Sequence, residues 1–209
     1  MRQPAMFKIH IVNWMNRKAY QAHLERYFRI RHQIYIEERN WRQIERPIPF
    51  EIDAFDTEHT IYLIGIDDDG NIAGSSRLVP TTEPHLLSVV FPMLTEADPP
   101  KGPEIFEWTR FFVSPPLRIS GKSSLAAGVV LCGLLEASLV LGVTQISVVC
   151  EAFWPNRLRK LGWSVQQLGP VLDHPDGCIL ALLINVSADA LAATRAAYGL
   201  DEASVLANA

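Results

Sequence analysis

Three carboxylates fall within six residues directly before an apolar segment of the chain. Glu51, Asp53 and Asp56 lie in the stretch "EIDAFD", and the apolar run at 61–66 follows it closely. An acidic surface loop of this kind can serve solubility alone. Beside a buried strand, carboxylates can also bind arginine side chains or accept a proton from a substrate.

A second pair of charges lies in "EIFEWTRFF", an otherwise apolar stretch at 104–112. Glu107 and Arg110 are three residues apart, so on a regular strand they would point to opposite faces. Either they have unrelated roles, or a β-bulge brings them to one face, as bulges beside active sites often do. Charges among so many aromatic residues are costly unless they are partnered or functional.

Three further residues could bind a ligand that carries both a cation and a carboxylate. Arg31 and Tyr35 share one face of a predicted helix, and Trp41 follows that helix. Ordinary helix packing beside a surface arginine is the alternative. Arg77, in the strand "GSSRLVPTT", is a plausible ion-pair partner for the acidic stretch.

The segment "RISGKSS" at 118–124 joins a predicted strand to a long helix. Gly121 would let the backbone approach a phosphate at the helix N-terminus, although a simple cap by Ser120 or Ser123 is equally compatible. A P-loop is excluded because its first glycine would fall at Pro116. The spacing of Arg118, Gly121 and Ser123 resembles the acyl-coenzyme-A loop of the N-acetyltransferase fold.

The pattern of expected helices and strands predicts one α/β domain over residues 1–209. The chain is 48% hydrophobic, which is enough for one sizeable core. Strands are expected at 6–13, 61–66, 72–79, 105–113, 145–150, 164–168 and 178–186. Helices are expected at 20–38, about 121–142, within "WPNRLRKLGW" and after Ser187, with fraying from about residue 201. This order predicts a three-layer α/β/α sandwich around one mixed sheet.

Composition excludes several classes of protein. The net charge of −4 gives no electrostatic basis for binding nucleic acid or an anionic membrane. The three cysteines form no CxxC pair and the six histidines show no metal-ligand spacing, so we expect no metal site. The same cysteine pattern fits a protein located in the reducing cytoplasm. The apolar stretch 123–143 is long enough for a membrane span, but Glu136 and its small residues predict a buried helix.

Taken together, these residues resemble the acyl-homoserine-lactone synthases, the LuxI-type autoinducer synthases of bacterial quorum sensing. The matching positions are Arg31, Tyr35 and Trp41; Glu51, Asp53 and Asp56; Gly74, Arg77, Leu78, Pro80, Thr81 and Thr82; Phe91, Pro92 and Leu94; and Glu107, Arg110 and Phe111. Order and spacing agree from about residue 24 to 113, and Tyr35 replaces the usual phenylalanine. The C-terminal half matches in pattern only.

The resemblance implies an N-acetyltransferase-like fold and two substrates, S-adenosylmethionine and an acyl thioester, with no cofactor. The amine of S-adenosylmethionine attacks the thioester, and lactonisation then expels 5′-methylthioadenosine. Glu51 and Glu107 are the candidate bases, with Arg110 as their orienting partner. Tyr35 and Trp41 suit the sulfonium and Arg31 the carboxylate, while Asp53, Asp56, Arg77 and Phe91 complete the pocket. We expect the three carboxylates and three arginines to form a buried ionic network.

The resemblance leaves the acyl donor open. An acyl carrier protein would dock on the basic residues Arg157, Arg159 and Lys160, whereas an acyl-coenzyme A would use Arg118 and Gly121. The stretch "FRIRHQIYIEERNWR" is closer to members that use branched or aryl coenzyme-A thioesters. Ser147 would line the acyl pocket. Two other classes stay open: an ordinary acyl-CoA-dependent N-acyltransferase and a non-catalytic ligand-sensing domain.

Overall fold

The computed structural model describes residues 7–119 and 124–207, which build one mixed sheet of seven strands. The strands are β1 (Lys8–Val12), β2 (Ile61–Ile66), β3 (Ile72–Pro80), β4 (Ile105–Val113), β5 (Gln145–Glu151), β6 (Ser164–Gln167) and β7 (Ile179–Asn185). Their spatial order is β1-β2-β3-β4-β5-β7-β6, and only the β4–β5 pair is parallel.

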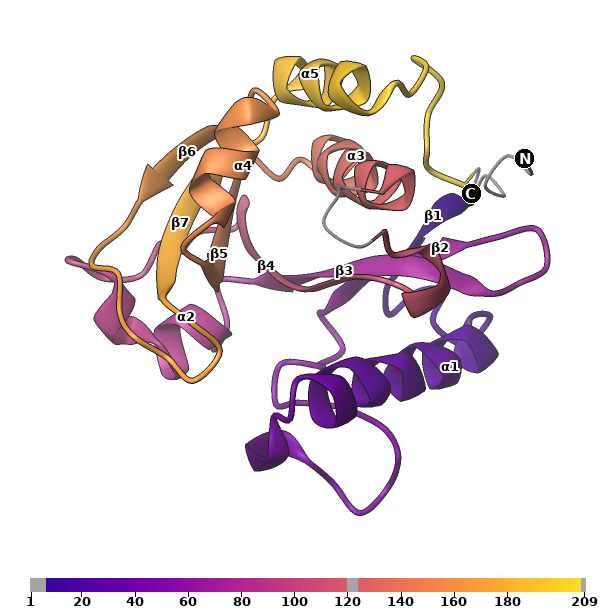
Figure 1. The fold of residues 1–209 in the computed structure, drawn as a ribbon, viewed down its shortest axis with the longest axis horizontal. Coiled ribbons are helices and arrows are strands. Elements are labelled where there is room, and N and C mark those ends of the chain that lie inside the picture. The colour runs from indigo at the N-terminus through magenta and orange to yellow at the C-terminus, as the bar shows by residue number, and fades with distance from the viewer. Residues whose placement is uncertain (1–6, 120–123, 208–209) are drawn as a thin grey trace.

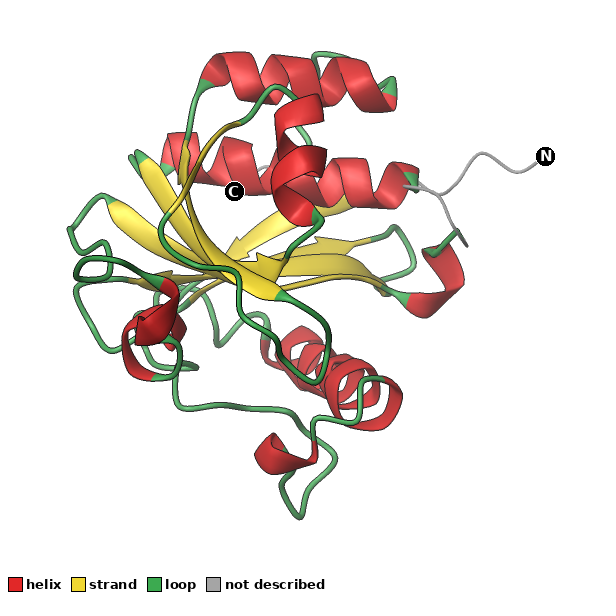
Figure 2. Ribbon diagram, turned by 60° about the vertical axis from the view of Figure 1, so that its left-hand side comes forward, coloured by secondary structure: helices red, strands yellow, loops and turns green. Residues whose placement is uncertain are grey.

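Helices cover both faces of this sheet, which confirms the predicted three-layer α/β/α sandwich (Figures 1 and 2). One face carries α3 (Leu125–Val140), α4 (Trp154–Lys160) and α5 (Ala188–Tyr198), and the other carries α1 (Gln21–Arg31) and α2 (Leu86–Val89). The short helices are η1 (His32–Glu38), η2 (Arg42–Ile44), η3 (Pro92–Leu94) and η4 (Pro115–Leu117).

The parallel strands β4 and β5 separate partway along their length. Their register runs only from Ile105 opposite Gln145 to Glu107 opposite Ser147, although both strands continue beyond these residues. The backbone hydrogen bonds of the separated parts are therefore not shared between the two strands. Space for a ligand can open between them, in the centre of the sheet.

The predicted helix at 20–38 changes its winding at its midpoint. An α-helix over Gln21–Arg31 continues as a wider π-helical segment over His32–Glu38, in which the N–H of Arg39 donates to the carbonyl of Ile34. Such segments are rare and are frequent at functional sites. The wider winding buries three successive side chains, at 34–36, and one of them is Tyr35.

Helix α3 lies between the sheet and α5, and thirteen of its sixteen residues are buried. Its own Ser124 caps the N-terminus by accepting a hydrogen bond from the N–H of Ala127 at 3.2 Å. Among the described residues, no helix is long and apolar enough to cross a membrane. Two glycines allow α3 to approach its neighbours closely: Gly133 packs against Ile9 of β1, and Gly128 packs against Tyr198 of α5.

We expect Gly133→Ala to destabilise the protein by about 1–2 kcal/mol, although alanine is the better helix former by about 1 kcal/mol. A Cβ atom at this position would lie 2.4 Å from Cγ1 of Ile9, a buried, β-branched side chain with little freedom to move. Urea unfolding of both proteins measures the difference. Gly102→Ala is the matched control, because its Cβ would meet nothing closer than 3.4 Å. A Gly133→Ala variant as stable as the wild type would contradict the close approach.

The expectation of a frayed tail over 201–209 is wrong for Ser204–Ala207. The N–H of Ile9 donates to the carbonyl of Val205 at 2.8 Å, so the tail lies along the outer edge of β1. Glu136 of α3 accepts hydrogen bonds from the Ser204 hydroxyl at 2.6 Å and from the Val205 N–H at 3.1 Å. The buried carboxylate of α3 thus holds the tail. This contact is not evident from the tail sequence alone.

Candidate active site

Arg31, the last residue of α1, is fully buried and bonded to two carboxylates. Its Nε atom donates to Glu51, and its two terminal nitrogens donate to Asp56 at 2.8 and 2.9 Å. The bond to Asp56 is therefore bidentate, the strongest geometry for an arginine and a carboxylate. The hydroxyl of Tyr62 donates to the same Asp56 side chain at 3.1 Å.

Asp53 joins the other two arginines. Arg77 of β3 donates to both oxygens of Asp53, at 2.7 and 2.8 Å, and its Nε donates to the Thr109 hydroxyl. Arg110 of β4 bridges Asp53, at 2.7 Å, and Glu51, at 2.8 Å. The predicted network of three carboxylates and three arginines is therefore present, and each carboxylate bonds to at least two arginines.

The network has three positive and three negative side chains, and each of them is at most 12% exposed. Burial alone would raise the pKa of Glu51, but Arg31 and Arg110 outweigh burial and lower that pKa to about 2. Burial likewise opposes ionisation of Asp56, yet the neighbouring arginines hold its pKa far below the usual range. All of these carboxylates are therefore held by cations, which leaves Glu51 a poor proton acceptor.

A β-bulge in β4 explains how Arg110 reaches this network. The register pairs Arg77 with Thr109 and Ser75 with Phe112, so two residues of β4 face one residue of β3. Arg110, inside the bulge, has a φ angle of +52°, which is unusual for a residue other than glycine. The bulge puts Arg110 on the same face of the sheet as Thr109, towards α1.

The aromatic pair predicted beside Arg31 forms a stack. The rings of Tyr35 and Trp41 lie 5.0 Å apart with an interplanar angle of 24°. The guanidinium of Arg110 lies 5.0 Å from the Tyr35 ring, and that of Arg39 lies 5.6 Å from the Trp41 ring. The cations facing the pair in this structure are therefore arginines, and the role of the stack towards a sulfonium stays a prediction.

Glu107 differs from the carboxylates of the network because its hydrogen-bond partners are backbone groups. The N–H of Leu86 donates to Oε2 at 2.8 Å, and the N–H of Leu87 donates to Oε1 at 2.6 Å. The side chain is fully buried. Burial raises its pKa to about 7, against the effect of these two hydrogen bonds. Glu107 can therefore exchange a proton near neutral pH.

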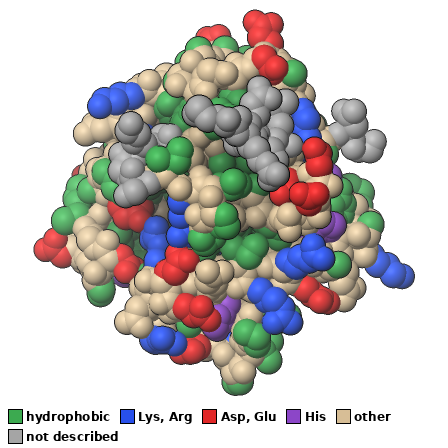
Figure 3. Space-filling view, turned by 45° about the vertical axis from the view of Figure 1, so that its right-hand side comes forward, with side chains coloured by type: hydrophobic (Ala, Val, Ile, Leu, Met, Phe, Trp, Pro, Cys, Tyr) green, Lys and Arg blue, Asp and Glu red, His purple; other side chains and the backbone are tan. Residues whose placement is uncertain are grey.

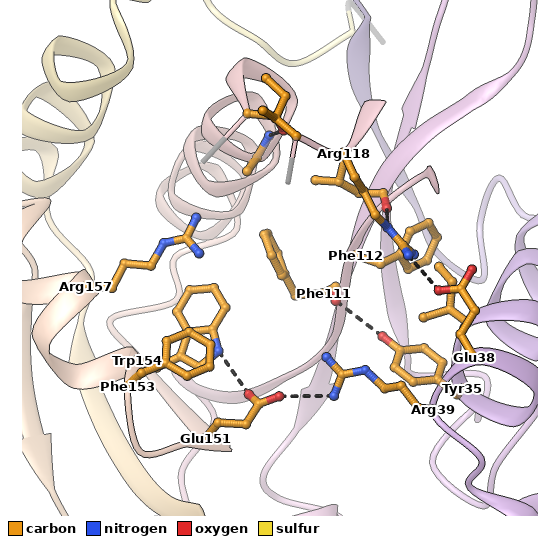
Figure 4. A pocket seen from close by; sticks show the side chains of 15 residues that line it. Tyr35, Glu38, Arg39, Phe111, Phe112, Arg118, Glu151, Phe153, Trp154 and Arg157 are labelled. Atoms are coloured by element: carbon orange, nitrogen blue, oxygen red, sulfur yellow. Dashed lines mark hydrogen bonds and ion pairs between the residues drawn. The ribbon is translucent and has the colours of Figure 1, made fainter. Parts of the chain in front are cut away.

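A cavity of about 750 Å³ opens beside the aromatic stack, on the side of α3 and α4 (Figure 4). Its lining includes Tyr35, Phe111, Trp154, Arg118 and Arg157, and Figure 4 shows the two arginines on opposite sides of Phe111. Two ion pairs lie along it, Arg118–Glu38 and Arg39–Glu151. A volume in this range suits a ligand the size of a drug or a cofactor.

A second cavity of about 140 Å³ extends between the separated parts of β4 and β5. Its lining is mixed, with apolar residues such as Trp108, Val148 and Leu158 and charged ones such as Arg110 and Glu151. Leu86, whose N–H binds the Glu107 carboxylate, also lines it. The residues that line both cavities are Tyr35, Arg39, Phe111, Glu151 and Trp154. Because the two cavities adjoin, two substrates could meet there.

The residues predicted to contact the acyl donor are divided between these cavities and the surface. Arg118 and Arg157 line the larger cavity, whereas Arg159 and Lys160 are exposed on α4. Gly121 lies outside the described residues. Ser147 is buried beside Glu107 in the strand register, one residue before the part of β5 that lines the smaller cavity.

Phe91 lies at the end of α2, away from the arginines of the network. It packs with the cluster of Leu87, Leu94 and Ile179, and its ring meets the His174 ring edge-on at 6.0 Å. The loop that carries His174 also reaches the aromatic stack, because Asp176 accepts a hydrogen bond from Nε1 of Trp41. The predicted contact of Phe91 with substrate stays a prediction.

Sequence reasoning missed several residues that line the cavities. Arg39, Glu151 and Trp154 line both cavities, and the backbone of α2 holds Glu107. The stretch "RNW" before the acidic segment offered a signal for Arg39. A backbone N–H that binds a carboxylate leaves no mark on residue type, so the cradle of Glu107 had no sequence signal.

The face in Figure 3 carries acidic and basic side chains interspersed, with apolar side chains between them. On this face the charges do not gather by sign. A surface of that kind gives no extended basic stripe of the sort that tracks a nucleic-acid backbone.

Comparison with known proteins gives a family match over most of the chain. The family model described as "Autoinducer synthase" matches residues 15–193. The isovaleryl-homoserine lactone synthase of Bradyrhizobium diazoefficiens is 37% identical over 162 residues, which cover 77% of this chain and 72% of that protein.

Solved structures agree with this match. MesI, a CoA-dependent acyl-homoserine lactone synthase, is 58% identical with a TM-score of 0.88, over 97% of this chain and all of that one. BjaI, a CoA-dependent acyl-homoserine lactone synthase solved with SAM and isopentyl-CoA, is 31% identical with a TM-score of 0.89, over 96% of this chain and 92% of that one. A putative N-acetyltransferase from Lactobacillus plantarum, at 17% identity and a TM-score of 0.51, shares the fold alone.

Proposed function

This chain belongs to the autoinducer synthase family and is an acyl-homoserine-lactone synthase, and we propose that its acyl donor is a coenzyme-A thioester with a short or branched acyl group. The enzyme transfers the acyl group to the amine of S-adenosylmethionine. Lactonisation then releases 5′-methylthioadenosine. The observation that supports this reaction best is the pair of adjoining cavities that share Tyr35. Arg110 and Trp41 line the smaller cavity, together with Leu86, whose N–H binds the Glu107 carboxylate.

Glu107 is the general base in this proposal. The ammonium group of S-adenosylmethionine must lose a proton before the amine can attack a thioester carbonyl, and a base works best when its pKa lies near the working pH. Burial raises the pKa of Glu107 to about 7, whereas Arg31 and Arg110 lower that of Glu51 to about 2. Glu51 therefore serves to hold the two arginines in place.

The arginine network organises the S-adenosylmethionine side of the site. Arg31, Arg77 and Arg110 are fixed by the three carboxylates, so their positions cost no ordering when substrate arrives. Arg110 has access to both the network and the aromatic stack. We assign Tyr35 and Trp41 to the sulfonium side of the substrate and Arg110 to orienting the acids around it.

The donor assignment rests on three observations. Arg118 and Arg157 line the larger cavity, where they could contact the phosphates of coenzyme A, and two similar proteins are CoA-dependent by name. The smaller cavity, lined in part by Trp108 and Leu158, has a volume of about 140 Å³, which leaves little room for a long chain. Arg159 and Lys160 on α4 are the residues that a carrier protein would use instead.

A panel of donors tests this assignment. We expect the highest kcat/KM with isovaleryl-CoA or another short branched thioester, and a loss of about tenfold or more with octanoyl-CoA, since a cavity of about 140 Å³ has little room for the longer chain. The same acyl groups on an acyl carrier protein form the comparison. Mass spectrometry of the lactones identifies each product. A preference for the carrier-protein thioesters, or for the long chain, would overturn the donor assignment.

We also place the reaction in the cytoplasm, without a cofactor. The three cysteines, Cys132, Cys150 and Cys178, are free thiols, which fits a reducing compartment. Burial raises the pKa of Cys150 above its usual range, so this thiol at the smaller cavity is a lining group and no nucleophile. S-adenosylmethionine is consumed as a substrate.

A further inference from the structure

The two groups that hold Glu107 belong to a helix of a single turn. Leu86 and Leu87 are the first residues of α2, which ends at Val89, and their N–H groups point at the two oxygens of Glu107. One turn of helix is marginal on its own, because nucleation fixes several backbone angles for one hydrogen bond. Something outside the turn must therefore fix the direction of these N–H groups.

His85, directly before α2, provides that constraint. Its N–H donates to the Ser88 hydroxyl at 3.1 Å, and that hydroxyl returns a hydrogen bond to the His85 carbonyl at 3.0 Å. The ring Nδ1 lies 2.9 Å from the Glu83 carbonyl and 3.2 Å from the Ser88 oxygen. Since a carbonyl only accepts, Nδ1 carries the hydrogen. Burial lowers the pKa of His85, which favours the neutral Nδ1–H form of the ring.

The ring is also locked in place. His85 is buried, with 2% of its surface exposed, and its Nε2 atom has no hydrogen-bond partner among the described residues. A buried acceptor without a partner costs free energy, so a histidine kept here for packing alone would be a poor choice. The ring spans from Glu83 to Ser88 and closes the turn that carries the two N–H donors.

We propose that His85 is a positioning residue: by linking the Glu83 carbonyl to the Ser88 hydroxyl across the start of α2, its ring aims the N–H groups of Leu86 and Leu87 at the Glu107 carboxylate and so sets the pH at which Glu107 can accept a proton from the substrate amine. His85 itself touches neither substrate nor reacting atoms. This role rests on the proposed function, since it presupposes that Glu107 is the base of lactone synthesis.

The direction of the effect follows from the groups around Glu107. Burial raises its pKa, and the Leu87 and Leu86 N–H groups lower it. The charged groups that also act on this pKa are Arg77 on β3, which lowers it, and Asp53, which raises it. On β5 its register neighbour, Ser147, is uncharged. Loosening the N–H donors removes a stabilising contact of the carboxylate and therefore raises the pKa of Glu107.

The test is the pH profile of kcat for 5′-methylthioadenosine release, with S-adenosylmethionine and isovaleryl-CoA, over pH 5.5 to 9. We expect His85→Ala to move the acidic limb to higher pH by about one unit, because hydrogen bonds to a charged group are worth that much or more. The rate on the alkaline plateau is largely retained. Thermal unfolding of the same proteins reports any purely structural effect.

Substitutions at His85 and Ser88 make the test specific. His85→Asn keeps a side-chain N–H that can donate to the Glu83 carbonyl, so the limb should return towards its wild-type position. Ser88→Ala removes the hydroxyl that the ring and the His85 backbone both contact and should shift the limb as His85→Ala does, which also covers the case of a His85→Ala protein that does not fold. His59→Ala, at an exposed histidine, should leave the profile unchanged.

Two results would overturn the proposal. A lower melting temperature with an unmoved acidic limb in His85→Ala and Ser88→Ala would make His85 purely structural. An acidic limb that disappears in both His85→Ala and His85→Asn would mean that His85 itself titrates. Both results require an active wild-type enzyme, so they are distinct from a failure of the proposed function, in which the wild type makes no lactone from any donor.

Discussion

Glu107→Gln is expected to lower kcat for lactone formation by about 10²–10⁴-fold, the usual contribution of a positioned general base. Glutamine fills the same space and can still accept the N–H of Leu86 or Leu87, but it cannot take a proton. Steady-state release of 5′-methylthioadenosine measures the loss. Glu104→Gln, at an exposed position directly before β4, is the matched control and should keep full activity.

The same variant should change the pH dependence of stability. The unfolded chain loses this carboxyl proton near pH 4.5, whereas the folded enzyme keeps it until about 7. Between these values the folded state binds more protons, so the free energy of unfolding of the wild type falls as pH rises. Urea unfolding should show the wild type losing stability relative to Glu107→Gln between pH 5 and pH 8. For the activity prediction, a full acylation rate in Glu107→Gln would contradict the role of Glu107 as the general base.

Asp56→Asn is expected to cost about 3–5 kcal/mol of the free energy of unfolding, because it leaves buried cations without a counterion. Asp56 bonds to both Arg31 and Arg77, each fully buried, so asparagine leaves one uncompensated positive charge in the core. Replacing a whole ion pair by apolar residues can be neutral, but removing one partner is not. Urea unfolding at pH 7 gives the difference.

Tyr62→Phe separates charge from hydrogen bonding in this prediction. It removes the hydroxyl that donates to Asp56 and keeps the network neutral, so we expect a loss of only about 1 kcal/mol. An Asp56→Asn protein no less stable than Tyr62→Phe would mean that the ionic network does not carry the stability assigned to it. Affinity for S-adenosylmethionine should fall with Asp56→Asn, since Arg31 loses its bidentate support.

The ionic network could be predicted because the family resemblance singled out the three arginines and the sequence placed three carboxylates before a buried strand. Glu51, Asp53 and Asp56 precede a buried strand, and charges in such a place need partners. Which carboxylate meets which arginine could not be predicted, since it depends on the path of the 51–56 loop and on the bulge at Arg110. The spacing of Glu107 and Arg110 indicated that a bulge was one of two solutions, without deciding between them.

Other features depended on contacts between distant segments. The tail at Ser204–Ala207 is held by β1 and by Glu136, and neither partner is near it in sequence. The π-helical segment at 32–38 has the same apolar spacing as an α-helix within the precision of pattern reading. His85 is one of six histidines without metal-ligand spacing, and its contacts with Glu83 and Ser88 depend on the backbone around α2, so residue type alone does not indicate its proposed role.

The measurement that tests the central claim most directly is the stoichiometry of the products in one reaction. With S-adenosylmethionine and isovaleryl-CoA, free coenzyme A, 5′-methylthioadenosine and acyl-homoserine lactone should form in equal amounts and at one rate, and all three should fall together in Glu107→Gln. Release of coenzyme A with an acylated amine but without methylthioadenosine or lactone would contradict the account. That result would make the protein an ordinary N-acyltransferase.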